Sequence, residues 1–169
     1  REEAEATLLG ALAIQRQTGN RHYEGLSLHL LATLHGERGR PDEAEKALEA
    51  AESIAVELGD RVLRATVLTG RGRAHAGKDE QERAVACYEE ALAIYSLLDD
   101  GGMTALNLCN LARSLVAVGR QAEARDRWDE GIEKSRKYID PRAIAELQQA
   151  MDDACARAGI PPFPSKPPA

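Results

Sequence analysis

Residues 81–118, QERAVACYEEALAIYSLLDDGGMTALNLCNLARSLVAV, contain one copy of each of two helical patterns that recur along this chain. When the chain is written in lines of 20 residues, the two patterns alternate, and each returns after 40 residues without a gap. A fixed period of this length indicates a stacked array of helical repeats. The sequence therefore predicts an all-α fold.

The first pattern is an alanine followed by a large residue four positions later and a small one three positions after that. Spacings of four and seven put all three side chains on one helical face, where small residues let a neighbouring helix approach closely. The face is extended by Ile14, Ile54 and Ile94. The four copies are Ala4, Leu8 and Ala11; Ala44, Leu48 and Ala51; Ala84, Tyr88 and Ala91; and Ala124, Trp128 and Gly131.

The second pattern is a leucine, another leucine three positions later, and a small residue directly after it. Two copies keep the pattern fully, and the copy between them has Arg71 and Gly72 instead, which predicts looser packing there. One turn later, His35 and His75 share their position with Leu115, which favours a packing role for both histidines. The leucines and small residues are Leu28, Leu31 and Ala32; Leu68; and Leu108, Leu111 and Ala112.

Helix ends recur at the same spacing. Caps are predicted at Asn20, Asp60, Asp100 and Asp140, and first-turn prolines at Pro41 and Pro141. Glycines that can end a helix in the left-handed conformation stand at Gly19, Gly39, Gly59, Gly119 and Gly159. We therefore expect about eight helices in a repeat domain at 1–160, with a partial unit 1–20, units 21–60, 61–100 and 101–140, and a capping helix 141–159.

Residues 160–169 contain five prolines and predict an extended or disordered tail. Two interpretations of this tail stay open. Its PPFPSKPP run is suited to dock into an aromatic-lined groove as a polyproline helix, or it serves as a spacer.

Composition limits the partners. With 22 Lys and Arg against 28 Asp and Glu, the net charge of −6 gives no basic footprint, so direct binding to duplex DNA is not expected. No apolar run approaches the ~20 residues that cross a bilayer, so no membrane partner is expected. The three cysteines show no C-x-x-C pairing, and we expect a reduced, cytoplasmic chain. Because the chain begins at Arg1 within a helical pattern, it looks like a piece of a longer protein.

Catalytic motifs are missing from the sequence. It has no Gly-rich phosphate loop, no H-E-x-x-H and no nucleophile motif, so we predict that the protein is not an enzyme and needs no cofactor. His22 and His29 lie seven residues apart on one helical face, but two candidate ligands are too few for a metal site.

The alanine, large and small residues at these spacings resemble the second helix of a tetratricopeptide repeat, and the L-x-x-L-[AG] pattern resembles its first helix. The period exceeds the usual ~34 residues, and ALAIYSLLDD (91–100) and ALNLCNLARSLVAV (105–118) are similar to the long-helix variety of kinesin light chain and bacterial regulators. HEAT and armadillo arrays share the longer period but do not require this spacing. The resemblance implies a right-handed superhelical stack of antiparallel helix pairs, a TPR-like α-solenoid.

In that family the first helix of each pair lines a groove that binds peptides or helices. Because Arg73 and Arg113 are 40 residues apart, they would lie on neighbouring inner helices, where guanidinium groups bind carboxylates well. An acidic peptide is therefore the expected partner; the alternative is that both arginines are solvated or paired within the protein. The groove residues implied by the resemblance are His29, Thr33, Thr69, Arg73, Cys109, Asn110 and Arg113.

Three functions remain open. The first is a non-catalytic scaffold that binds a protein or peptide within a larger bacterial signalling or transcription regulator. The second is a homo-oligomerisation module, in which the first helix offers an apolar stripe, Leu8, Leu12 and Ile14, to a second copy; the alternative is that an upstream repeat covers this stripe. The third is a small-ligand or RNA-binding array. The inner helices have almost no aromatic residue other than Tyr23, which disfavours the base stacking that RNA binding needs.

Overall fold

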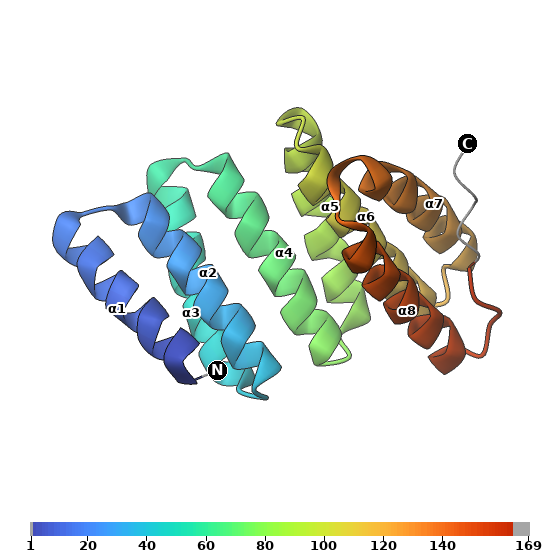
Figure 1. Ribbon diagram of the computed structural model, residues 1–169, viewed down its shortest axis with the longest axis horizontal. Helices are drawn as coiled ribbons and strands as arrows, with labels where there is room; N and C mark the ends of the chain where they lie inside the picture. The colour runs from blue at the N-terminus through green and yellow to red at the C-terminus, as the bar shows by residue number, and fades with distance from the viewer. Residues whose placement is uncertain (1, 164–169) are drawn as a thin grey trace. The chain divides into compact units, whose positions relative to one another are not determined.

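The computed structural model describes residues 2–163, and these residues form eight α-helices and no strand (Figure 1). Each helix has 17 or 18 residues and is joined to the next by a short turn. The predicted all-α fold is confirmed. The helices are α1 (Glu2–Thr18), α2 (Arg21–Glu37), α3 (Pro41–Leu58), α4 (Arg61–Gly77), α5 (Gln81–Leu97), α6 (Gly101–Ala117), α7 (Gln121–Tyr138) and α8 (Pro141–Arg157).

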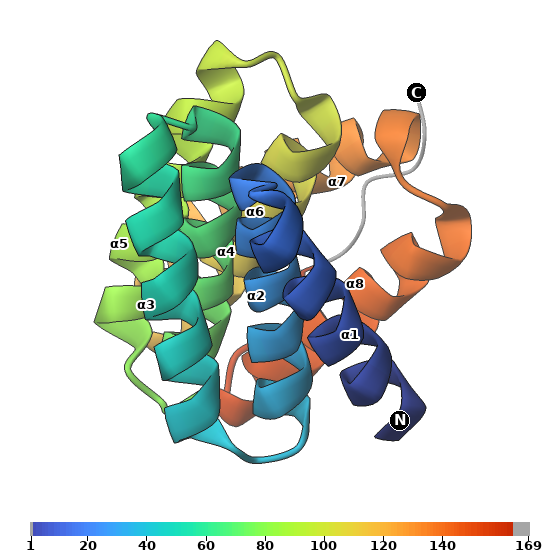
Figure 2. The same cartoon turned by 90° about the vertical axis from the view of Figure 1, so that its left-hand side faces the viewer.

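The chain divides into two compact units, Arg1–Lys78 and Asp79–Ala169. In the first unit α2 packs against α1, α3 and α4, and in the second α6 packs against α5, α7 and α8. Within each unit, helices that follow one another run in opposite directions, as Figures 1 and 2 show. The boundary between the units falls inside the predicted repeat 61–100, and a superhelix running through both units stays a prediction.

The core of each unit is built from the periodic residues. Every alanine, large and small residue of the first pattern is buried in α3, α5 and α7. In α1, by contrast, Ala4 is exposed and Leu8 and Ala11 are only partly buried, although Leu12 is buried. Among the described helices α1 packs only against α2, which leaves part of its patterned face uncovered.

The turns explain where the helices end. All five predicted glycines have φ between 62° and 80°, the left-handed region in which glycine carries no steric penalty. Asp60, Asp100 and Asp140 each accept a hydrogen bond from a backbone N–H of the following helix. The cap predicted at Asn20 is wrong. Its ψ of 74° is less extended than that of the three aspartates, and its side chain makes no capping bond.

Candidate functional site

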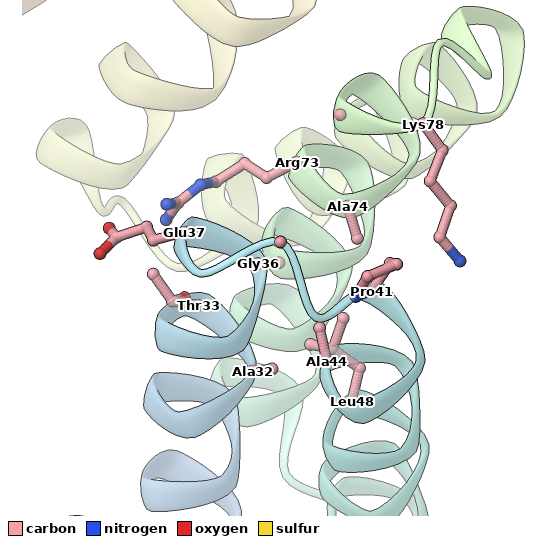
Figure 3. A pocket seen from close by; sticks show the side chains of 13 residues that line it. Ala32, Thr33, Gly36, Glu37, Pro41, Ala44, Leu48, Arg73, Ala74 and Lys78 are labelled. Atoms are coloured by element: carbon pink, nitrogen blue, oxygen red, sulfur yellow. The ribbon is translucent and has the colours of Figure 1, made fainter. Parts of the chain in front are cut away.

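A cleft of about 490 Å³ opens in the first unit between the second half of α2, the start of α3 and the second half of α4. Figure 3 shows the side chains around it. Its floor is apolar, and polar side chains stand at its edge. The lining residues come from α2 (Ala32, Thr33, Gly36, Glu37), the α2–α3 turn and α3 (Gly39, Pro41, Ala44, Leu48), and α4 and the residue after it (Gly70, Arg73, Ala74, Gly77, Lys78).

The cleft exists because α4 presents very small residues to α2 and α3. Gly70, Ala74 and Gly77 follow one another at spacings of four and three, so they share one face of the helix. The sequence predicted looser packing here from Arg71 and Gly72. In the structure, however, Gly72 is buried and Arg71 pairs with Glu52 of α3 at 2.6 Å, so neither residue lines the open space.

One cation at the edge of the cleft has no carboxylate partner among the described residues. Arg73 is exposed, and its side chain extends from α4 toward the end of α2, where Thr33 and Glu37 lie (Figure 3). Within residues 2–163 no carboxylate lies at ion-pair distance from its guanidinium. Lys78, the other cation of the rim, is paired with Glu45 at 2.6 Å. Among the described residues, Arg73 is therefore the cation that the cleft offers to a ligand, and the carboxylate of Glu37 lines the cleft as well.

His29 does not line the cleft, but it lies close enough to Arg73 for the charge of Arg73 to act on its ring. Its ring packs over Gly70, where a Cβ would come within 2.8 Å of Nδ1, so a larger side chain at this position would require the ring to shift. Burial, and then the charge of Arg73, lower the pKa of His29 to about 4. The imidazole is neutral at pH 7, and its Nδ1 has no hydrogen-bond partner among the described residues.

Thr69 does not take part in this arrangement. It is buried, and its hydroxyl donates to the carbonyl oxygen of Ala65 in its own helix at 3.0 Å. Of the four groove residues predicted in the first unit, Thr33 and Arg73 line the cleft, whereas His29 and Thr69 do not.

The three groove residues predicted on α6 belong to the second unit. Cys109 is fully buried against α7, beside Gly131 and Ser135, and burial raises the pKa of its thiol to about 12. Asn110 is also buried. Arg113 is partly exposed, and its Nε is buried without a hydrogen-bond partner in the part of the chain that the structure describes. Arg113 is the residue of this group that remains open to a ligand.

The two histidines considered for a metal site, His22 and His29, contact different residues. His22 Nδ1 is 2.5 Å from the carboxylate Oδ2 of Asp60, whereas His29 packs over Gly70. Across residues 2–163, no three His, Cys, Asp or Glu side chains gather in a way that could hold a metal ion. None of the helices in this range is long and apolar enough to cross a membrane.

Helices that alternate in direction and bury a periodic face define the class of helical repeat proteins. Models of the tetratricopeptide repeat match residues 1–57 and residues 65–96, which together make up more than half of the chain. The chain therefore belongs to the tetratricopeptide repeat family, whose members generally serve as non-catalytic scaffolds for interactions between proteins. A search of curated proteins gives no match.

Proposed function

We propose that the chain is a protein-interaction module whose cleft in the first unit binds an extended peptide through one apolar side chain and a neighbouring carboxylate. The observation that carries this proposal is the guanidinium of Arg73, which has no ion-pair partner in the described part of the chain and lies at the edge of an apolar cleft. A volume of about 490 Å³ lies within the ~300–1,000 Å³ of ordinary ligand sites.

Each part of the ligand has a matching part of the cleft. The apolar side chain enters between Ala32, Leu48 and Ala74, which form the floor. The carboxylate meets Arg73, whose planar guanidinium can donate two parallel hydrogen bonds. His29 stays neutral at pH 7, because its pKa lies near 4, and so adds no second charge. Thr33 supplies a hydroxyl at the edge. An acidic residue next to a bulky apolar one is therefore the expected motif.

Reversing the charge of Arg73 tests this proposal. Peptides selected on an array of sequences that pair Asp or Glu with Leu, Ile or Phe should bind Arg73→Glu about 10- to 100-fold more weakly than the wild type. Losing a charge-assisted hydrogen bond costs about 1.5–3 kcal/mol, which corresponds to that range. The affinities are measured by fluorescence anisotropy, with circular dichroism to check folding.

Arg61→Glu is the matched control. Arg61 is exposed at the first residue of the same helix, away from the cleft, so the same change in net charge should leave binding unchanged. Ala74→Leu, which fills the cleft, should abolish binding of the same peptides. If every selected peptide binds Arg73→Glu as tightly as the wild type, Arg73 is only a solvated charge and the cleft is not the site.

We place this module in the cytoplasm, within a larger bacterial signalling or transcription regulator. Helices of 17 and 18 residues agree with the resemblance to the long-helix arrays of such regulators. In this role the cleft would recruit or sense a partner for an attached domain.

Self-association is a second candidate function, favoured by exposed apolar side chains on α1. Leu9 is 51% exposed and Ile14 is 62% exposed, both on a helix that packs only against α2 within the described part of the chain. We expect a concentration-dependent increase in sedimentation coefficient for the wild type and none for Leu9→Glu/Ile14→Glu. Monomeric wild type at every concentration would exclude this candidate, and Val56→Glu, exposed on α3, controls for a general change in surface charge.

A further inference from the structure

The chain that follows α8 turns back toward α7 (Figure 1), and it carries a buried aromatic side chain, Phe163. Residues 160–163, IPPF, have no regular secondary structure, yet Phe163 is only 4% exposed. The guanidinium of Arg125 in α7 lies over the Phe163 ring, 4.3 Å from its centroid. The amide of Gln148 in α8 donates to the carbonyl oxygen of Phe163 at 3.0 Å. Both helices therefore hold this segment, one by its side chain and one by its backbone.

The residues of α8 that hold the segment depart from the repeat. Gln148 stands where the other helices of its class have Leu28, Leu68 and Leu108, and Asp152 stands where they have Ala32, Gly72 and Ala112. The Gln148 amide also donates to Asp152 Oδ1 at 2.8 Å, so Asp152 orients the group that meets the Phe163 carbonyl. Gln148 and Asp152 thus replace the apolar residues of the repeat, and the Gln148 amide supplies the hydrogen-bond donor for the Phe163 carbonyl oxygen.

The segment begins where the next helix of the array would begin. Pro161 is in register with the first residues of α3, α5 and α7, which are Pro41, Gln81 and Gln121. Proline is accepted at a first helical position, but the residues before Pro161, Pro162 and Pro164 are biased toward extended backbone. The sequence also has proline at position 164, in register with the alanines Ala44, Ala84 and Ala124. This sequence favours an extended segment over a helix against α7 and α8.

Residues 160–163 leave space beside Phe163. A pocket of about 300 Å³ adjoins it, lined by residues of α7 (Gln121, Ala122, Arg125) and of the segment itself (Ile160, Pro161, Phe163). The binding surface is therefore larger than the four residues that cover it.

We propose that the surface formed by Arg125 of α7 and by Gln148 and Asp152 of α8, here called the α7–α8 groove, is a binding site for an aromatic side chain on an extended, proline-flanked segment. Phe163 fills this groove in cis and so controls access to it. The ring is recognised by the cation of Arg125 and the backbone by the amide of Gln148. This site lies in the second unit and does not depend on the cleft of the first.

Emptying the groove should let a separate copy of the segment bind. The probe is a fluorescein-labelled peptide with the sequence of residues 158–169, AGIPPFPSKPPA, measured by fluorescence anisotropy on the full chain. Saturable binding is expected with Phe163→Ala. Binding to the wild type should be weaker by about tenfold or more, because a tethered segment competes at an effective concentration in the millimolar range. The same peptide with alanine in place of phenylalanine should not bind.

Changes in the groove separate recognition from stability. In the Phe163→Ala chain, Arg125→Gln and Gln148→Leu should each weaken binding of the peptide, whereas Arg127→Gln, an exposed residue of α7, should not. Phe163→Leu keeps an apolar side chain in place and serves if Phe163→Ala proves unstable. Absence of binding to a folded chain of either kind would overturn the proposal, and so would equal binding to the wild type, since that would put the peptide elsewhere.

Discussion

Replacing Trp128 by alanine is expected to lower the free energy of unfolding by about 3–5 kcal/mol, the usual range for removing a buried aromatic side chain. Trp128 is the largest fully buried side chain among the described residues, and it lies in α7, which packs against both α6 and α8. Alanine would leave a cavity that these helices cannot close without moving. The loss is measured by urea unfolding, followed by circular dichroism.

Trp128→Phe provides the control for this experiment. The indole N–H of Trp128 is buried without a hydrogen-bond partner within residues 2–163, so phenylalanine removes an unsatisfied donor along with part of the ring. Its cost should therefore be clearly smaller than that of alanine. A loss near zero for Trp128→Ala would contradict the burial that the structure gives this residue.

Local spacing made this part of the core predictable. Spacings of four and seven residues place Ala124, Trp128 and Gly131 on one face of a single helix. All three residues are buried in the structure. The same offsets in α1 do not bury Ala4. A residue on such a face is buried only where a second helix packs over it. The periodic pattern predicts which residues share a face, but it does not predict which helix covers that face.

The candidate sites were predicted less completely because they depend on contacts between helices. The family resemblance predicted that Thr69, Arg73 and Cys109 all face a groove. It did not fix the rotation of each helix, and Thr69 and Cys109 are buried in the packed interior. The cleft follows from Gly70, Ala74 and Gly77 together. Their spacing is visible in the sequence, whereas the space that they leave depends on how closely α4 approaches α2 and α3.

The contact made by Phe163 shows the same limit. The prolines predicted an extended or disordered tail over residues 160–169; residues 160–163 have no regular secondary structure, and the rest of this tail lies outside the described residues. The burial of Phe163, however, requires Arg125 and Gln148 from two different helices, 38 and 15 residues away along the chain. The one visible sign was that Gln148 departs from the leucine of the repeat.

Gly131→Val is expected to cost about 3 kcal/mol of unfolding free energy, the upper end of the range for overpacking a core. A Cβ at Gly131 would lie 3.0 Å from the Cβ of Leu108 and 3.1 Å from the backbone nitrogen of Cys109, both in α6. Neither atom can rotate aside, so α6 and α7 must separate. Gly10→Val makes the same change where nothing lies within 4 Å, and should cost nothing or stabilise α1 slightly.

For the cost of adding a Cβ at a glycine, the kind of neighbouring atom matters more here than its distance from the Cβ. A Cβ at Gly25 would come closer to its neighbour, at 2.4 Å, but that neighbour is the Cδ2 methyl of Leu63, which can turn away. Gly25→Ala should therefore cost less than Gly131→Ala, despite the shorter distance. Urea unfolding of both alanine variants decides the order. The reverse order would mean that α6 and α7 separate more easily than the Leu63 side chain changes its rotamer.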